Sequence, residues 1–205
     1  SHFTLLWDAG AVCGKGTGTL TYPCSLNAYV GDYLGHPAPD GTAVIFHDDE
    51  LDRCTNGSGL LAQSSWAQVR QLDAGSWFSA QFSTERVSTL SEALAEIQLL
   101  GLGLNLEIKH EGAGLEPFVD LVLTALAREW RDNDRLLLSS FNHQALLLCQ
   151  AQAPHLRRGQ LYETVPANWR QELKNISAYS LHCDYLALDY TRATAIKAAG
   201  YRLLC

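Results

Sequence analysis

This 205-residue chain lacks several features that define common protein classes. Its six cysteines form no CxxC pair, which argues against a zinc ribbon or a thioredoxin-like motif. No apolar run reaches the roughly 20 residues of a membrane-spanning helix, and no basic start followed by an apolar run marks a signal peptide. With 15 basic against 22 acidic residues, the net charge of −7 argues against broad nucleic-acid binding. We therefore expect a cytoplasmic protein with reduced thiols and no nucleic-acid partner.

The chain also has little that fits a dinucleotide-binding or P-loop protein. Its glycine-rich segment at 14–18 (GKGTG) matches neither GxGxxG nor GxxxxGK[ST]. Such a loop is expected after the first strand of a doubly wound open sheet. A doubly wound sheet is therefore the second choice of fold.

Short apolar runs alternate with amphipathic stretches along the chain, the pattern of a parallel sheet with crossover helices. Strands are expected at 43–47, 102–108, 136–140, 158–162, 185–188 and 201–204, with one or two more before residue 35. Helices are expected at 64–72 (capped by Ser64 or Ser65), 91–100 (capped by Ser91), 115–130, 142–152, after Pro166 and at 191–199. This order favours an α/β fold of the (β/α)8 TIM-barrel type that lacks its last helix–strand unit.

Ionisable side chains follow or end two of the predicted strands. His47 follows an apolar run at 43–46, and Glu107 and Lys109 alternate on the strand around 102–108. Because polar groups at the carboxyl ends of buried strands face a common mouth, we expect these residues to form one site. A carboxylate for a hard cation, an ammonium for an anion and an imidazole for proton transfer point to a site that holds a metal and an anion.

Each of these residues also has a simpler interpretation. His47 fits a salt-bridged residue at a strand end, and Glu107 with Lys109 fits an exposed pair on an edge strand. Arg53 is suited to gripping a phosphate oxygen, or to a surface salt bridge with Asp49 or Asp52. The acidic run at 48–52 is expected to be solvated, and the remaining histidines to lie on the surface or in packing, with His110 and Glu111 as less certain candidates for the rim.

Several motifs resemble those of bacterial glycerophosphodiester phosphodiesterases. The matching segments are HDDELDRCTNGSG at 47–59, LDAGSWF at 72–78, TLSEAL at 89–94, NLEIK at 105–109, LSSF at 138–141 and AAGYR at 198–202. Ser88, just before the segment at 89–94, stands where the family has proline. The resemblance covers about residues 40–205, and the motifs together are highly specific.

This resemblance implies one barrel domain over 1–205, with a small insertion at about 48–88. It implies a divalent cation, Mg²⁺ or Ca²⁺, and cleavage of a glycerophosphodiester into glycerol 3-phosphate and an alcohol. By motif match, His47 is an acid/base histidine, Glu107 a metal ligand, and Lys109 a catalytic and substrate-binding residue at the phosphate. Arg53 matches the family's arginine, for which we expect substrate binding.

The first 40 residues depart from the family pattern. Asp8 falls near the position of a His-Arg-Gly motif, so one catalytic histidine is absent. Asp32 falls at a Glu-x-Asp motif, where it is a shorter metal ligand, and Leu34 cannot ligate. A garbled N-terminal sequence is the preferred explanation; a degenerate relative and a weaker rebuilt site are the others.

Two other functions stay open beside hydrolysis. One is a catalytically impaired barrel that binds phosphodiesters or a partner without turnover. The other is a related barrel lipase at a membrane, for which Trp77, Phe78 and Phe82 would form an apolar rim.

Overall fold

The computed structural model describes residues 25–31 by their backbone path, and residues 42–110 and 114–205 in full. Asp8, the segment at 14–18, Asp32 and Glu111 lie outside these ranges. Among the described residues, none of the helices is long and apolar enough to span a bilayer.

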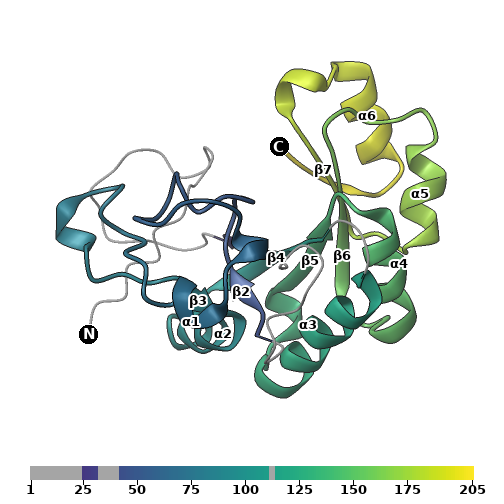
Figure 1. Cartoon of the computed structure of the whole chain (residues 1–205). Coiled ribbons are helices and arrows are strands. Elements are labelled where there is room, and N and C mark those ends of the chain that lie inside the picture. The colour runs from purple at the N-terminus through teal and green to yellow at the C-terminus, as the bar shows by residue number, and fades with distance from the viewer. Residues whose placement is uncertain (1–24, 32–41, 111–113) are drawn as a thin grey trace.

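Within the described residues, eight strands form one sheet in the order β3-β2-β1-β4-β5-β6-β7-β8 (Figure 1). Their bounds are β1 Ser25–Gly31, β2 Val44–Ile45, β3 Ser88–Thr89, β4 Gly103–Lys109, β5 Leu136–Ser140, β6 Arg157–Tyr162, β7 Ser180–Cys183 and β8 Arg202–Leu204. Parallel pairing joins β1, β4, β5, β6, β7 and β8 in that order, whereas β2 is antiparallel to both β1 and β3. The predicted α/β class with a largely parallel sheet is confirmed.

Helices alternate with most of the strands, as the sequence pattern predicts. They are α1 Trp66–Val69, α2 Leu90–Leu99, α3 Leu115–Glu129, α4 His143–Gln152, α5 Trp169–Asn175 and α6 Tyr190–Ala198. Short 3-10 turns lie at Leu61–Gln63, Ala80–Phe82, Asn133–Arg135 and Tyr185–Ala187. Asn142 caps α4 by accepting hydrogen bonds from the backbone N–H groups of Gln144 and Ala145, which ends β5 and turns the chain into the helix.

The two faces of the sheet differ because successive side chains on a strand point to opposite sides. On β4, Leu104, Leu106 and Ile108 are buried in the core with α2, α3 and α4. Leu181 on β7 packs in a second cluster with residues of α5 and α6. The register places these apolar residues on one face, and Glu107, Ser139, Gly159 and Ser180 on the other. The helices thus cover one face of the sheet, as in a barrel, and not both faces as in a doubly wound fold (Figure 1).

Two local predictions are wrong. The apolar residues at 185–188 form a 3-10 turn in which Tyr185 and Leu186 are exposed, and the strand lies just before them at Ser180–Cys183. The Asp184 side chain accepts a hydrogen bond from the Leu186 N–H, which ends the strand and starts the turn. The cap of α2 is Thr89 and not Ser91, because Thr89 forms a capping box with Glu92.

The expected strand at 43–47 is only two residues long and runs against the parallel strands. Val44 pairs with Gly31 of β1, and Gly31 in turn pairs with Lys109 of β4. The carboxyl end of β2 therefore does not share an edge with that of β4, as the sequence pattern indicated. Instead the chain turns back along β1 beside the end of β4, and His47 lies two residues beyond Ile45.

Residues 46–87, between β2 and β3, pack around a small core of their own. Phe46, Leu51, Leu61 and Val69 are buried in it. The helix expected at 64–72 is shorter, at Trp66–Val69, and Ser65 is its N-cap as predicted. In Figure 1 this segment lies at the left of the molecule, away from α3 to α6.

Candidate active site

A cavity of about 740 Å³ opens at the ends of β4, β5 and β6, beside the segment that follows β2. Its lining residues are His47, Glu107, Ile108, Lys109, His110, Ser140, Phe141, Asn142, Leu161 and Glu163. Three of the residues predicted from sequence to form one site, His47, Glu107 and Lys109, therefore face the same space. They come from segments about sixty residues apart, which the pairing of β1 with β2 and β4 brings together.

Glu107 is the buried acidic group of this cavity. It lies on β4 with only 6% of its surface exposed, and it has no hydrogen bond or ion pair among the described residues. Burial raises the pKa of its carboxyl group to about 7, and the positive charge of Lys109 partly offsets that shift. Because β4 is paired on both sides, with β1 and β5, the interpretation of Glu107 and Lys109 as an exposed pair on an edge strand is wrong.

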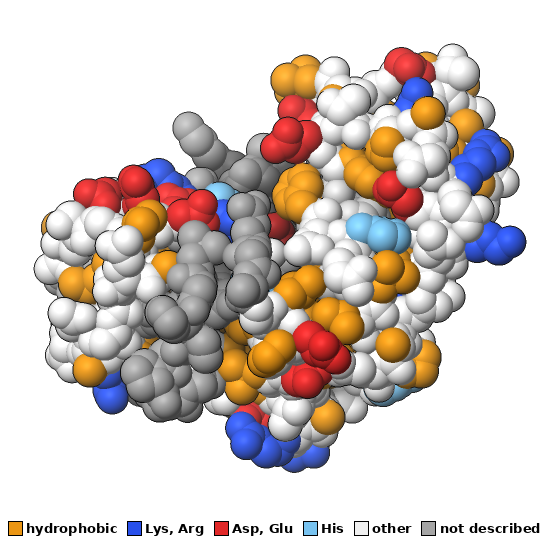
Figure 2. All heavy atoms as spheres, turned by 45° about the vertical axis from the view of Figure 1, so that its right-hand side comes forward, with side chains coloured by type: hydrophobic (Ala, Val, Ile, Leu, Met, Phe, Trp, Pro, Cys, Tyr) orange, Lys and Arg blue, Asp and Glu red, His pale blue; other side chains and the backbone are white. Residues whose placement is uncertain are grey.

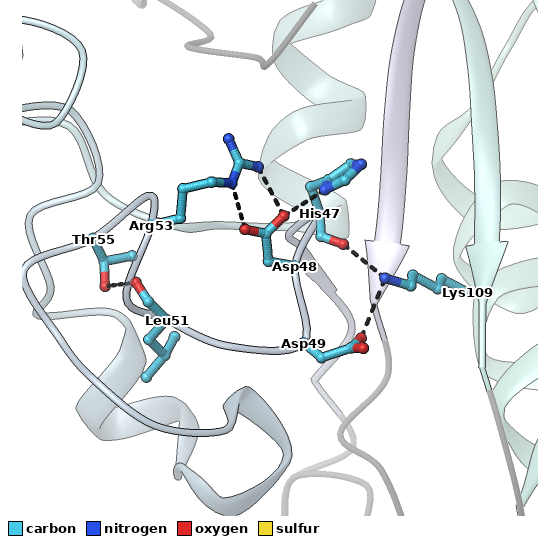
Figure 3. Close-up of polar contacts among 7 residues, drawn as sticks. All are labelled: His47, Asp48, Asp49, Leu51, Arg53, Thr55 and Lys109. Carbon is cyan, nitrogen blue, oxygen red and sulfur yellow. Dashed lines mark hydrogen bonds and ion pairs between the residues drawn. The ribbon is translucent and has the colours of Figure 1, made fainter. Parts of the chain in front are cut away.

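His47 is oriented by a short chain of charged groups (Figure 3). Its Nδ1 lies 2.5 Å from Oδ1 of Asp48, and the Arg53 guanidinium contacts both Asp48 oxygens at 2.6 and 2.7 Å. The hydrogen bond from Arg53 is the main reason that the pKa of Asp48 falls to about 2. Asp48 is therefore an anion near neutral pH and accepts the Nδ1–H of His47, and Nε2 points away from Asp48 in Figure 3.

Arg53 thus contacts the acidic run through Asp48, and not through Asp49 or Asp52. The turn that carries Arg53 is fixed by Thr55, whose hydroxyl donates to the Leu51 carbonyl at 2.6 Å. The expectation that the whole run at 48–52 is solvated holds for Asp49 and Asp52, which are exposed, and is wrong for Asp48, which is part of this chain of contacts. Figure 2 shows the exposed acidic side chains of this part of the molecule gathered at its upper left.

Lys109 links the two segments of the site. Its Nζ donates to the backbone carbonyl of His47 at 3.1 Å and lies 3.2 Å from Oδ1 of Asp49 (Figure 3). The ammonium therefore lies at the cavity wall next to the histidine, and it holds the end of β4 against the chain that follows β2.

Side chains that the sequence reasoning did not select fix the end of β5. The Ser140 hydroxyl donates to the Ile108 carbonyl at 2.6 Å, and Asn142 Nδ2 donates to the His110 carbonyl at 3.2 Å. Both bonds tie β5 to β4 at the cavity. The signal for them was the polar residues Ser139, Ser140 and Asn142 at the end of an apolar strand.

The other predicted candidates have different outcomes. Asp32 and Asp8 lie outside the described residues. His182 is buried, as the packing interpretation predicts, and its ring nitrogen Nε2 lies 2.8 Å from the Ser180 hydroxyl. His110 is buried at the cavity, and Cys183 is a buried free thiol in an apolar cluster.

One side chain of the cavity is suited to binding a divalent cation. Glu107 is a buried carboxyl group with no hydrogen-bond partner in the part of the chain that the structure describes, and its oxygens are the kind of ligand that Mg²⁺ and Ca²⁺ prefer. Within residues 42–110 and 114–205 no group of three or more His, Cys, Asp or Glu side chains is arranged to hold a metal. The described part of the chain thus offers Glu107 as a single ligand.

Comparison with known proteins gives a consistent result. Residues 38–205 match the model of the glycerophosphoryl diester phosphodiesterase family. A glycerophosphodiester phosphodiesterase of Caldanaerobacter subterraneus is 34% identical over 165 residues, which cover 80% of this chain and 67% of that protein. A glycerophosphodiester phosphodiesterase of Bacillus subtilis is 26% identical, and the match covers 80% of this chain and 61% of that protein.

Among solved structures, an Oleispira antarctica phosphodiesterase in complex with its product sn-glycerol-3-phosphate is similar in fold and sequence. It superposes with a TM-score of 0.81 at 35% identity and covers 87% of this chain and 70% of the other. The chain described above therefore spans about two thirds of the length of these relatives.

Proposed function

This chain belongs to the glycerophosphoryl diester phosphodiesterase family, and on that premise we propose that it hydrolyses glycerophosphodiesters to glycerol 3-phosphate and an alcohol with the help of Mg²⁺ or Ca²⁺. The observation that carries the proposal is that His47, Lys109 and Glu107 line one cavity. An imidazole, an ammonium and a buried carboxylate are the groups that phosphodiester hydrolysis needs.

In the proposed reaction, the P–O bond to the alcohol breaks, one water is consumed overall, and a proton reaches the leaving oxygen. His47 exchanges a proton with the attacking or leaving oxygen through Nε2, while Asp48 holds Nδ1–H and stabilises the imidazolium that forms. Arg53 keeps Asp48 ionised and in place, so we assign it a positioning role beside its predicted role in substrate binding. Lys109 neutralises a phosphate oxygen.

Glu107 would hold the cation, together with ligands such as Asp32 that lie outside the described residues. When bound, the cation supplies positive charge that stabilises the negative charge growing on the phosphoryl group. The carboxylate suits this role because no protein hydrogen bond among the described residues competes for it.

We also propose that the sheet closes into a (β/α)8 barrel. The support is that α2 to α6 cover one face and polar or small residues line the other. The cavity then lies where barrel enzymes bind ligands, at the carboxyl ends of the parallel strands.

The test is the release of glycerol 3-phosphate from glycerophosphocholine and glycerophosphoglycerol by protein of this sequence. We expect release with Mg²⁺ or Ca²⁺ and none with a chelator. Failure of the folded protein to hydrolyse either diester at any cation concentration would overturn the proposal, and binding without turnover would favour the impaired barrel.

A further inference from the structure

The cavity has two unlike walls. On one side His47 and Lys109 supply groups for a phosphate, and Asp48 holds the histidine. A second part of the lining, here called the second wall, is formed by Phe141, Leu161 and Glu163 at the ends of β5 and β6. A phosphodiester has two different ends, and the proposed hydrolysis uses only the first wall for its chemistry. The second wall is therefore available for recognition of the alcohol.

Phe141 and Glu163 follow two neighbouring strands, and Glu163 lies two positions beyond the residue that the register places opposite Phe141. Phe141 is the first residue after β5 and Glu163 the first after β6, and the register pairs Ser140 with Gln160. Neighbouring strands lie about 4.8 Å apart, so the chain places the ring and the carboxylate on adjacent strand ends.

The buried side chain of Gln160 holds the ends of β5 and β6 together. Its amide Nε2 lies 3.0 Å from the Ser140 carbonyl, 3.2 Å from the Phe141 carbonyl and 3.1 Å from the Leu161 carbonyl. Its Oε1 lies 2.8 Å from Nδ1 of His143 on α4. Gln160 is 1% exposed, so its contacts are shielded from water and the wall is a built feature of the fold.

The chemistry of the wall favours a cation. Phe141 leaves 54% of its surface exposed, and Glu163 is exposed with no hydrogen bond or ion pair among the described residues. An aromatic face attracts an ammonium group, and most strongly one that carries alkyl groups. A carboxylate at the same place adds a negative charge, which attracts the positive ammonium group.

We propose that Phe141 and Glu163 form the subsite for the alcohol part of the substrate, and that this subsite selects alcohols bearing an ammonium group, such as choline. The inference rests on the proposed function, because it assigns the phosphate to the His47 and Lys109 wall. A zwitterionic diester such as glycerophosphocholine places its negative phosphate and positive ammonium two carbons apart, which suits a cavity with a cationic and an anionic wall.

The experiment compares kcat/KM for glycerophosphocholine with that for glycerophosphoglycerol, whose alcohol is neutral. Glu163→Gln and Phe141→Leu are each expected to lower the ratio of the two values about tenfold, mainly through KM, and Glu163→Lys to lower it further. Glu96→Gln, on α2 outside the cavity, is the charge-matched control and should leave the ratio unchanged. Equal ratios in the wild type and the three wall variants would overturn the inference.

Direct binding separates this inference from the proposed function. Both diesters are titrated into the protein without cation and followed by NMR, which needs no turnover. Tighter binding of glycerophosphocholine that is lost in Glu163→Gln supports the subsite even if neither diester is cleaved. Equal binding of both diesters in the two proteins rejects it, whatever the outcome of the activity assay.

Discussion

His47 Nδ1 lies 2.5 Å from Oδ1 of Asp48, a residue adjacent to it in sequence, and the Arg53 guanidinium contacts the same carboxylate. A histidine held in this way keeps one tautomer, because the carboxylate accepts from Nδ1–H.

His47→Ala should lower kcat/KM for glycerophosphocholine by about 100-fold or more, since it removes the proton-transfer group. Asp48→Asn should lower it by about tenfold or more, because the imidazole loses its charged partner. Steady-state release of glycerol 3-phosphate measures both. Activity that survives both substitutions would show that this imidazole does not take part in the reaction.

Lys109→Met should lower kcat/KM by at least about tenfold, because the variant lacks a positive charge at the phosphate and the bond to the His47 carbonyl. Lys174→Met, which changes an exposed lysine on α5, is the matched control. The prediction fails if the two variants have equal activity.

Glu107→Gln should abolish stabilisation by cations without weakening the apo fold. Burial disfavours the ionised carboxyl group, so a neutral amide of the same shape should leave the melting temperature unchanged or higher. Added Mg²⁺ or Ca²⁺ should raise the melting temperature of the wild type and not of the variant. An equal cation-induced rise in both proteins would exclude Glu107 as the ligand.

His182 should make the protein sensitive to mild acid. Burial lowers its pKa from 6.5 to about 4, so between these values the unfolded chain binds a proton that the folded protein does not. The contribution of His182 to the free energy of unfolding is full above pH 6.5 and should fall by about 3 kcal/mol as the pH drops to 4. Urea unfolding should show a flatter pH dependence in His182→Gln and no change in the control His155→Gln, which alters an exposed histidine.

Gly159→Ala should destabilise the fold by about 1 to 3 kcal/mol. A Cβ at this position would lie 2.5 Å from His182 Nε2 and 2.6 Å from the Ser180 hydroxyl, and both residues are buried. The same substitution at Gly103, whose nearest contact would be 3.5 Å away, is the control. Equal melting temperatures for the two variants would contradict the close packing of β6 on β7.

Much of the architecture could be predicted from local pattern. The order of strands and helices from β4 to α4 follows from apolar periodicity. Two boundaries are also marked locally: Gly101 follows the end of α2, and Asn142 caps the start of α4. The prediction failed at 185–188, where four apolar residues follow the strand instead of forming it. Periodicity cannot show which of two adjacent apolar runs is paired with a neighbour, because pairing is a long-range contact.

For the site, the sequence by itself determined the chemical groups. His47, Glu107 and Lys109 are placed at the ends of apolar runs, and their types define an acid/base group, a cation ligand and a phosphate partner. The tertiary structure alone decided how they meet, because β2 runs antiparallel to β1 and returns the chain to the end of β4. It alone showed that Arg53 acts on Asp48, and that Phe141 and Glu163 share a wall. The meeting of His47 with the end of β4, about sixty residues further along the chain, depends on sheet order and register, which local sequence does not encode.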